Sequence, residues 1–315
     1  MGFIFKRKKK VSKDGTNVDI IGYSNDDNQT WEPVTESGKY LEEMMEYMDG
    51  IFPCQKEKPF VFHEIQSAIV HIDVNIIPPD SGRDYYVLWT SGMSDLPMTI
   101  PDGDYDKKAY ERAELVLFLP KDWKFAGIGE SAKELGDAYY WPIRWLKYLA
   151  RFPHEYKTWF GTGHTLPNSE DYDPLGEGTE MGGFFFLPVT SLGKDYPGID
   201  ALICKDGTKI NFLWTIPMYK EEIEYKLEEG FEPMMDLFTK VGFPRVLDPK
   251  RKNYIGGELY IRVSNFYPPS HIPFNHHLTC PFLKLGYRKI TDAVTQMGMQ
   301  SIHSAKLFEC SLFLW

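Results

Sequence analysis

In one early segment of the chain, apolar residues recur with the period of an α-helix. Its apolar residues recur at spacings of three and four: Tyr40, Leu41, Met44, Met45 and Met48. Glutamates lie between them, so the apolar side chains would share one face of a helix. The pattern predicts an amphipathic helix that ends at Gly50, since glycine favours helix ends.

Four segments that follow have the composition of β-strands. They cover residues 60–65, 69–77, 85–90 and 111–119. In the second segment, isoleucine and valine at 72, 74 and 76 alternate with His71, Asp73 and Asn75, as in a strand with one buried face. Short turns between successive strands favour antiparallel pairing.

The second half adds helices and further strands. Pro142 suits the first turn of a helix, and an apolar stripe follows it. Strands are expected at 184–189 and 210–216. Two acidic helices, at about 219–229 and 232–241, follow with Gly230 between them.

Charge is distributed unevenly along the 315 residues. Residues 1–13 hold six Lys or Arg and no acid, whereas residues 14–252 hold 24 basic and 42 acidic residues. A central region of that sign repels nucleic acid and would speed association with a basic protein, an effect that weakens with salt. Plain solubility would explain the same charge.

Targeting signals and the number of cysteines limit the possible cellular location of the protein. The chain has no run of 18 apolar residues, so we expect no transmembrane helix. A short apolar start precedes the basic run Lys6–Lys10, which is the reverse of a signal peptide. The four cysteines form no close pair, so a reducing, cytoplasmic location is predicted.

Three ordered blocks of sequence resemble signature segments of the suppressor-of-fused family. They read YYVLWTSGMSDLPM at 85–98, WFGTGHTLPN at 159–168 and IPMYKEEIEYKL at 216–227. The resemblance covers roughly residues 40–252. It implies a mixed sheet flanked by helices and no known catalytic activity. Bacterial members that resemble this chain are commonly immunity proteins that neutralise a toxin, and animal members hold a Hedgehog transcription factor inactive.

These observations lead to one expectation for architecture and function. We expect an α+β fold, with a mixed, largely antiparallel sheet flanked by helices. The predicted parts are a flexible basic and polar leader at 1–35, a suppressor-of-fused-like domain at 36–252 and a C-terminal extension of unknown role at 253–315. The predicted function is non-catalytic binding of a protein, as an immunity protein whose partner is a basic toxin such as a nuclease. The alternative is a regulator that sequesters a transcription factor or signalling protein. No cofactor, metal or nucleic acid is expected.

Acidity and motif position select the candidate partner-binding residues. They are Asp95, Asp102, Asp104, Asp106 and His164. Turn chemistry explains these acids about as well, since Asp95 would also brace the turn that it follows. For His164 a structural role in its glycine-rich loop is favoured over partner contact.

Other polar clusters are weaker candidates. His71 and Asp73 would share a strand face, but two ligands do not make a metal site. The segment Ser91–Asp95 lacks the Gly-x-Ser-x-Gly pattern of a hydrolase nucleophile. The tail contains His271, His276, His277, Cys280, His303 and Cys310, at spacings that fit no standard zinc finger.

Overall fold

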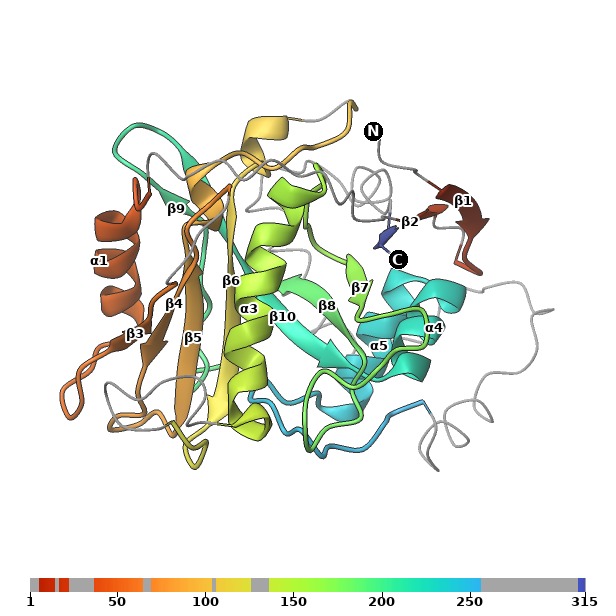
Figure 1. Ribbon diagram of the computed structural model, residues 1–315. Helices are drawn as coiled ribbons and strands as arrows, with labels where there is room; N and C mark the ends of the chain where they lie inside the picture. The colour runs from red at the N-terminus through yellow and green to blue at the C-terminus, as the bar shows by residue number, and fades with distance from the viewer. Residues whose placement is uncertain are drawn as a thin grey trace, which may run out of the picture.

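A mixed sheet runs through the molecule, and helices lie against both of its faces (Figure 1). The computed structural model describes residues 6–14, 17–22, 37–64, 69–103, 106–125, 136–255 and 311–314. The helices are α1 (Leu41–Ile51), α3 (Asp137–Glu155), α4 (Lys220–Glu229) and α5 (Phe231–Val241), with short 3-10 turns η1 (Met93–Asp95) and η2 (Lys107–Ala109). The strands are β1 (Lys6–Val11), β2 (Asn17–Gly22), β3 (Phe60–Phe62), β4 (Asp73–Ile77), β5 (Tyr85–Ser91), β6 (Ala113–Pro120), β7 (Thr165–Pro167), β8 (Gly183–Pro188), β9 (Leu202–Ile203), β10 (Lys209–Met218) and β11 (Ser311–Leu314).

Strand order explains why the sheet is mixed. The strands lie in the order β1-β2-β11-β7-β8-β10-β6-β5-β4-β3, and β9 pairs with β10 beside this path. β10 is parallel to β6 but antiparallel to β8, and β11 is parallel to both β2 and β7. The remaining pairs are antiparallel. The predicted α+β class, with a mixed and largely antiparallel sheet, is confirmed.

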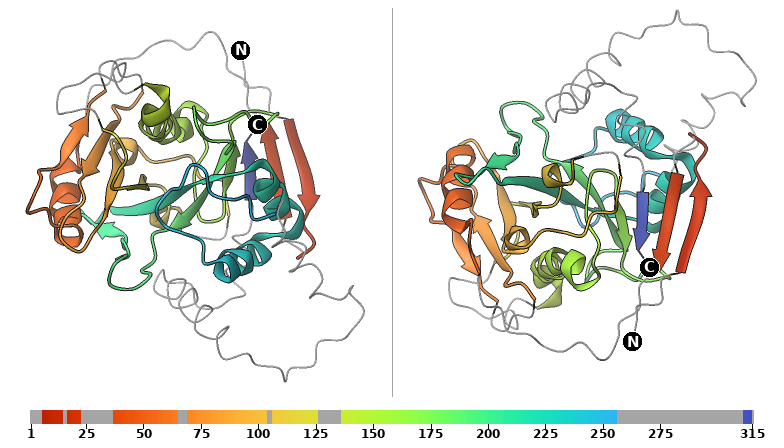
Figure 2. Two further views of the ribbon diagram at one scale, coloured as in Figure 1. Left: turned by 90° about the horizontal axis from the view of Figure 1, so that it is seen from below. Right: turned by 90° about the horizontal axis from the view of Figure 1, so that it is seen from above.

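Two apolar cores lie on opposite faces of the sheet. Helix α3 packs its buried stripe, including Trp141, Leu146 and Leu149, on one face. Helix α1 covers the other face with Met44 and Met48, and α5 covers the same face farther along. The views along the sheet show α3 on the opposite side from α4 and α5 (Figure 2). Both helix periods read from the sequence therefore point apolar residues at the sheet.

Two predicted boundaries are wrong. The strand expected at 69–77 begins only at Asp73, because Ile69 has a φ of 68° and leaves the extended conformation. Asn75, expected on a polar face, is buried and donates to Ser91 Oγ at 2.9 Å. Helix α3 begins at Asp137, so Pro142 lies inside it rather than in its first turn.

The leader and the end of the chain contribute strands to this sheet. β1 pairs with β2, and β2 pairs with β11, although the sequence pattern predicted no strand in either region. Lys13 lies beside α4, where its backbone N–H donates to Glu228 O at 2.8 Å. Gly230 has a φ of 117°, a conformation that favours glycine, and it lies beside the side chain of Asp14.

A buried ion pair attaches the segment after α5 to helix α4. Arg251 donates to both carboxylate oxygens of Glu222, at 2.5 and 2.6 Å, and both side chains are buried. Glu222 also accepts the backbone N–H groups of Tyr219 and Tyr254, at 3.0 and 3.1 Å. These contacts join α4 to the segment around residues 251–254. Among the described residues, no helix is long and apolar enough to cross a membrane.

Candidate protein-binding surfaces

The turn after β5 is built around one buried glutamate. Glu114 is fully buried, and it accepts hydrogen bonds from Ser94 Oγ at 2.6 Å and from Thr90 Oγ1 at 2.6 Å. The N–H groups of Gly92 and Ser94 donate to the same carboxylate, at 3.1 and 2.9 Å. Burial raises the pKa of Glu114 to about 7, because a charged carboxylate loses its hydration there.

Gly92 is required at this turn for steric reasons. Its φ is 108°, and a Cβ would lie 1.8 Å from the carbonyl oxygen of His71. The turn that the sequence identified by its Ser-Gly-Met-Ser-Asp pattern is therefore a packed structural element.

Asp95 joins this turn to the start of α1. Its carboxylate accepts the backbone N–H groups of Gly38 and Lys39, at 2.7 and 3.1 Å. Burial raises its pKa, while these two donors act in the opposite direction. The bracing role that the sequence left open for Asp95 is what its hydrogen bonds provide.

The other predicted acids lie in the loop around η2. Asp102 is exposed and pairs with Lys107 at 2.6 Å, and this hydrogen bond lowers the pKa of the carboxyl. Asp106 accepts the N–H of Lys108 at 3.0 Å and so caps η2. Asp104 lies outside the described residues. Asp102 and Asp106 thus share one loop, apart from the half-buried site of Asp95.

His164 lies inside the protein and not on its surface. Its side chain is 3% exposed, and its ring packs edge-on against Trp159 at 4.6 Å between centroids. Nδ1 accepts the N–H of Gly161 at 3.2 Å, and the backbone of its loop bonds to Phe186 of β8. His164 therefore shapes the loop before β7, which is the structural role favoured from its sequence.

His71 and Asp73 do meet, and the structure adds a second histidine. His71 Nε2 and His63 Nδ1 lie 3.1 and 3.0 Å from the two oxygens of Asp73. Within the described parts of the chain, no three His, Cys, Asp or Glu residues are arranged to hold a metal. The tail histidines and cysteines lie outside the described residues.

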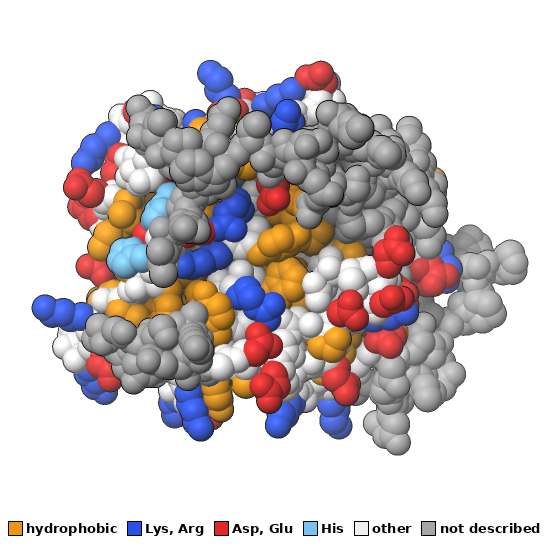
Figure 3. Space-filling model, viewed as in Figure 1, with side chains coloured by type: hydrophobic (Ala, Val, Ile, Leu, Met, Phe, Trp, Pro, Cys, Tyr) orange, Lys and Arg blue, Asp and Glu red, His pale blue; other side chains and the backbone are white. Residues whose placement is uncertain are grey.

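A dense acidic surface forms where the loop after β7 meets α4. Its exposed carboxylates belong to Glu170, Asp171, Asp173, Glu177, Glu180, Glu221, Glu224 and Glu228. Tyr172 joins the two parts, since Lys220 Nζ lies 5.4 Å from the centre of its ring. Acidic side chains gather at the right-hand side of the face in Figure 3. We refer to these eight residues as the acidic surface.

Sequence reasoning missed the acidic surface. The sequence pattern identified the loop after β7 only as glycine-rich and polar. It identified α4 only as an acidic helix, more than forty residues later in the chain. A helix with many carboxylates is usually just a solvated face. Only the packing of the loop against α4 combines the two groups of charge into one surface.

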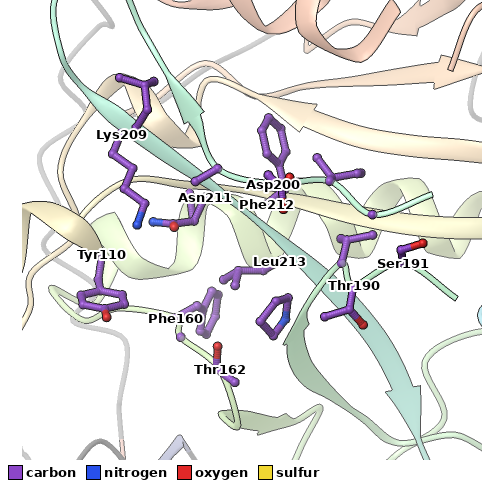
Figure 4. A pocket seen from close by; sticks show the side chains of 18 of the residues that line it. Tyr110, Phe160, Thr162, Thr190, Ser191, Asp200, Lys209, Asn211, Phe212 and Leu213 are labelled. Carbon is purple, nitrogen blue, oxygen red and sulfur yellow. The ribbon is translucent and has the colours of Figure 1, made fainter. Parts of the chain in front are cut away.

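A cleft of about 860 Å³ lies at the start of β10 (Figure 4). Its walls come from the segments after α3, after β8 and before β6. No sequence motif pointed to it, because its lining residues are spread over about a hundred positions.

The comparisons with known proteins decide the family. The sequence profile described as "Suppressor of fused protein (SUFU)" matches residues 69–252, which is more than half of the chain. The chain belongs to the suppressor-of-fused family. The three suppressor-of-fused blocks recognised in the sequence all lie inside the matched range. Members of this family are regulatory binding proteins that are not known as enzymes, and their domain is a protein-interaction domain.

Solved suppressor-of-fused structures resemble this chain at low sequence identity. A homologue from Neisseria gonorrhoeae FA 1090 is 17% identical, with a TM-score of 0.46, and the match covers 68% of this chain and 96% of that one. A chain of the Sufu-Fu complex is 10% identical, with a TM-score of 0.48 and coverages of 70% and 94%. Drosophila Suppressor of Fused is 10% identical, with a TM-score of 0.48, and the match spans 76% of this chain and 57% of that protein. No curated protein sequence matches this chain significantly.

Proposed function

We propose that this protein is a non-catalytic immunity protein that binds and neutralises a basic toxin, such as a nuclease, in the cytoplasm. The observation that carries the proposal is the acidic surface, where eight exposed carboxylates lie on a loop and a helix that meet at Tyr172 and Lys220. A nuclease needs a basic surface to hold phosphates. The acidic surface would compete with nucleic-acid phosphates for the basic side chains of the nuclease. It would thereby occlude the active site of the toxin without catalysing a reaction.

The proposal predicts how the complex forms. Complementary charge speeds association and makes it depend on salt. The loop that carries five of the acids is braced internally, since Leu175 N–H donates to Met181 O at 2.9 Å and Asp173 N–H donates to Ser169 Oγ at 3.0 Å. A braced loop loses little conformational freedom on binding, which favours a tight complex.

The first experiment captures the partner from native cells. The tagged protein is used as bait, the washes are at low and at high salt, and bound proteins are identified by mass spectrometry. Recovery of one basic nuclease-like protein, in larger yield at low salt, supports the proposal. Recovery of a transcription factor instead moves the function to regulation by sequestration, and recovery of no partner contradicts both.

Charge reversal then tests the surface itself. The variant carries Glu170→Lys, Asp171→Lys and Asp173→Lys. The control carries Glu42→Lys, Glu46→Lys and Asp49→Lys, which change the net charge equally at exposed positions of α1. We expect association with the captured partner to slow at least about tenfold in the variant at low salt, and much less in the control. Equal effects of the two variants would show that net charge, and not this surface, governs binding.

A further inference from the structure

The cleft at the start of β10 lies where the sheet divides. β8 pairs with β10 from Leu213 to Met218, and β9 pairs with it only at Lys209 and Ile210. Neither ladder includes Asn211 and Phe212, which pair only with β6 on the opposite edge of β10, and both residues line the cleft. The cleft and the loop of the acidic surface lie at opposite ends of β8, after Pro188 and before Gly183 respectively.

The lining combines an apolar floor with polar ends. Phe160 and Leu213 form part of the apolar lining, and both are buried. In Figure 4, the Lys209 ammonium and the Asn211 amide point toward Tyr110 at one end of the cleft. Thr190 and Ser191 lie at the other end. Such a mixture of apolar walls and a few placed polar groups is typical of ligand clefts, which span about 300–1,000 Å³.

Lys209 supplies the positive charge of the cleft. Its Nζ lies 5.9 Å from the centre of the Tyr110 ring. Among the described residues, no carboxylate oxygen lies within the 4.0 Å of an ion pair from this ammonium group. An acidic group of a ligand would therefore find an available cation at this end of the cleft.

Exposed apolar side chains flank the cleft. Ile203, which lines it, is 61% exposed, and Leu192, between the lining residues Ser191 and Gly193, is 51% exposed. Large apolar side chains grouped at the rim of a concavity mark interaction sites. Leu192 and Ile203 extend the apolar area of the cleft beyond its floor. This larger area favours a ligand longer than a small metabolite.

We propose that this cleft binds an extended peptide segment of a partner protein, with an acidic side chain beside Lys209 and an apolar side chain over Phe160 and Leu213. An extended peptide offers main-chain groups to a break in a sheet, and its alternate side chains reach pockets on one side. The hydroxyl groups of Thr162, Thr190 and Ser191 add donors and acceptors along the peptide. The proposal does not depend on the acidic surface, because it concerns the other end of β8.

The test uses random heptapeptides displayed on phage and selected on the full chain. We expect a consensus with Asp or Glu at one end and an apolar residue within three positions of it. A fluorescent synthetic peptide of that consensus is then titrated by anisotropy. Thr162→Trp fills the cleft, and Thr239→Trp on the exposed surface of α5 is the matched control. We expect Thr162→Trp to weaken binding at least about tenfold and Thr239→Trp to leave it unchanged.

Charge reversal and hydrogen exchange make the test independent of folding defects. Lys209→Glu should change the selected peptides from acidic to basic, which a misfolded protein could not do, whereas Lys250→Glu should leave the consensus acidic. The bound peptide should slow amide exchange in residues 209–213 and 189–191. The proposal is overturned by the absence of any consensus, by a peptide that binds Thr162→Trp as tightly as the natural protein, or by protection confined to other segments.

Discussion

The turn around Glu114 and the segment around Glu222 both bury a glutamate completely, but they hold it by different means. Glu114 is surrounded by hydroxyl and backbone N–H donors, whereas Glu222 faces the guanidinium of Arg251. Neutral donors only partly replace the water that a carboxylate loses, so the pKa of Glu114 rises to about 7. An arginine supplies the opposite charge to Glu222. Removal of either partner would lower the stability of the fold, because the remaining charge would stay buried without its counterion.

Removal of the arginine should have the largest effect. Arg251→Met leaves the carboxylate of Glu222 buried without its cation, so we expect a loss of about 3–5 kcal/mol in the free energy of unfolding, measured by urea denaturation. Lys250→Met changes an exposed neighbour and should have little effect. Adding Glu222→Gln to Arg251→Met should restore part of the loss. If Arg251→Met were as stable as Lys250→Met, the ion pair would not hold the segment.

The turn should instead respond to pH. The pKa of Glu114 is raised from 4.5 to about 7 in the folded protein, so folding takes up a proton between these values. The stability from this group is complete below pH 4.5 and is lost as the pH rises through about 7. Between about pH 5 and pH 8 the natural protein should lose on the order of 3 kcal/mol more than Glu114→Gln, measured by urea unfolding. Parallel pH profiles for the two proteins would contradict this account.

Loss of one donor to Glu114 should cost less. Ser94→Ala removes the hydroxyl that donates to Glu114 at 2.6 Å but keeps the backbone N–H of the same residue. We expect a loss of about 2 kcal/mol at high pH, where the carboxylate is charged, and a smaller loss at low pH. The control, Ser81→Ala, lies in an exposed turn. An effect of Ser94→Ala that is the same at both pH values would show that the hydroxyl does not recognise the charged form.

The smallest effect concerns the link from this turn to α1. Asp95→Ala removes the acceptor of the Gly38 and Lys39 N–H groups, and we expect a loss of about 1 kcal/mol in unfolding free energy. Hydrogen exchange should speed up at the start of α1 and leave α4 unchanged. An unchanged exchange rate at residues 38–41 would show that other contacts position the helix.

Much of the fold could be predicted from local pattern. The spacing of Met44 and Met48 predicted α1, and the strands around Tyr85 and Ile216 lie close to where their composition placed them. The boundary errors have local causes that periodicity does not encode. The positive φ of Ile69 shortens β4, and α3 accommodates Pro142 inside its length.

The candidate sites were less predictable, because they depend on contacts between distant segments. Asp95 and His164 were selected for their motifs, and the structure shows them bonded within turns and loops. The acidic surface needs the loop after β7 to pack against α4. The cleft needs β8 and β9 to leave a gap between their ladders with β10, at residues of β10 that pair with β6. Neither requirement leaves a signal in the spacing of residues.

The sequence by itself determined the family, the class of fold and the negative charge of the central region, because these follow from motifs, periodicity and composition. The tertiary structure decided which charges are exposed together and which are buried. Glu114, Glu222 and Glu224 are the same residue type, yet neutral donors hold the first, a buried arginine holds the second, and the third is exposed beside Lys220. Burial and partner geometry, which only the packed chain defines, set the free energy of each carboxylate.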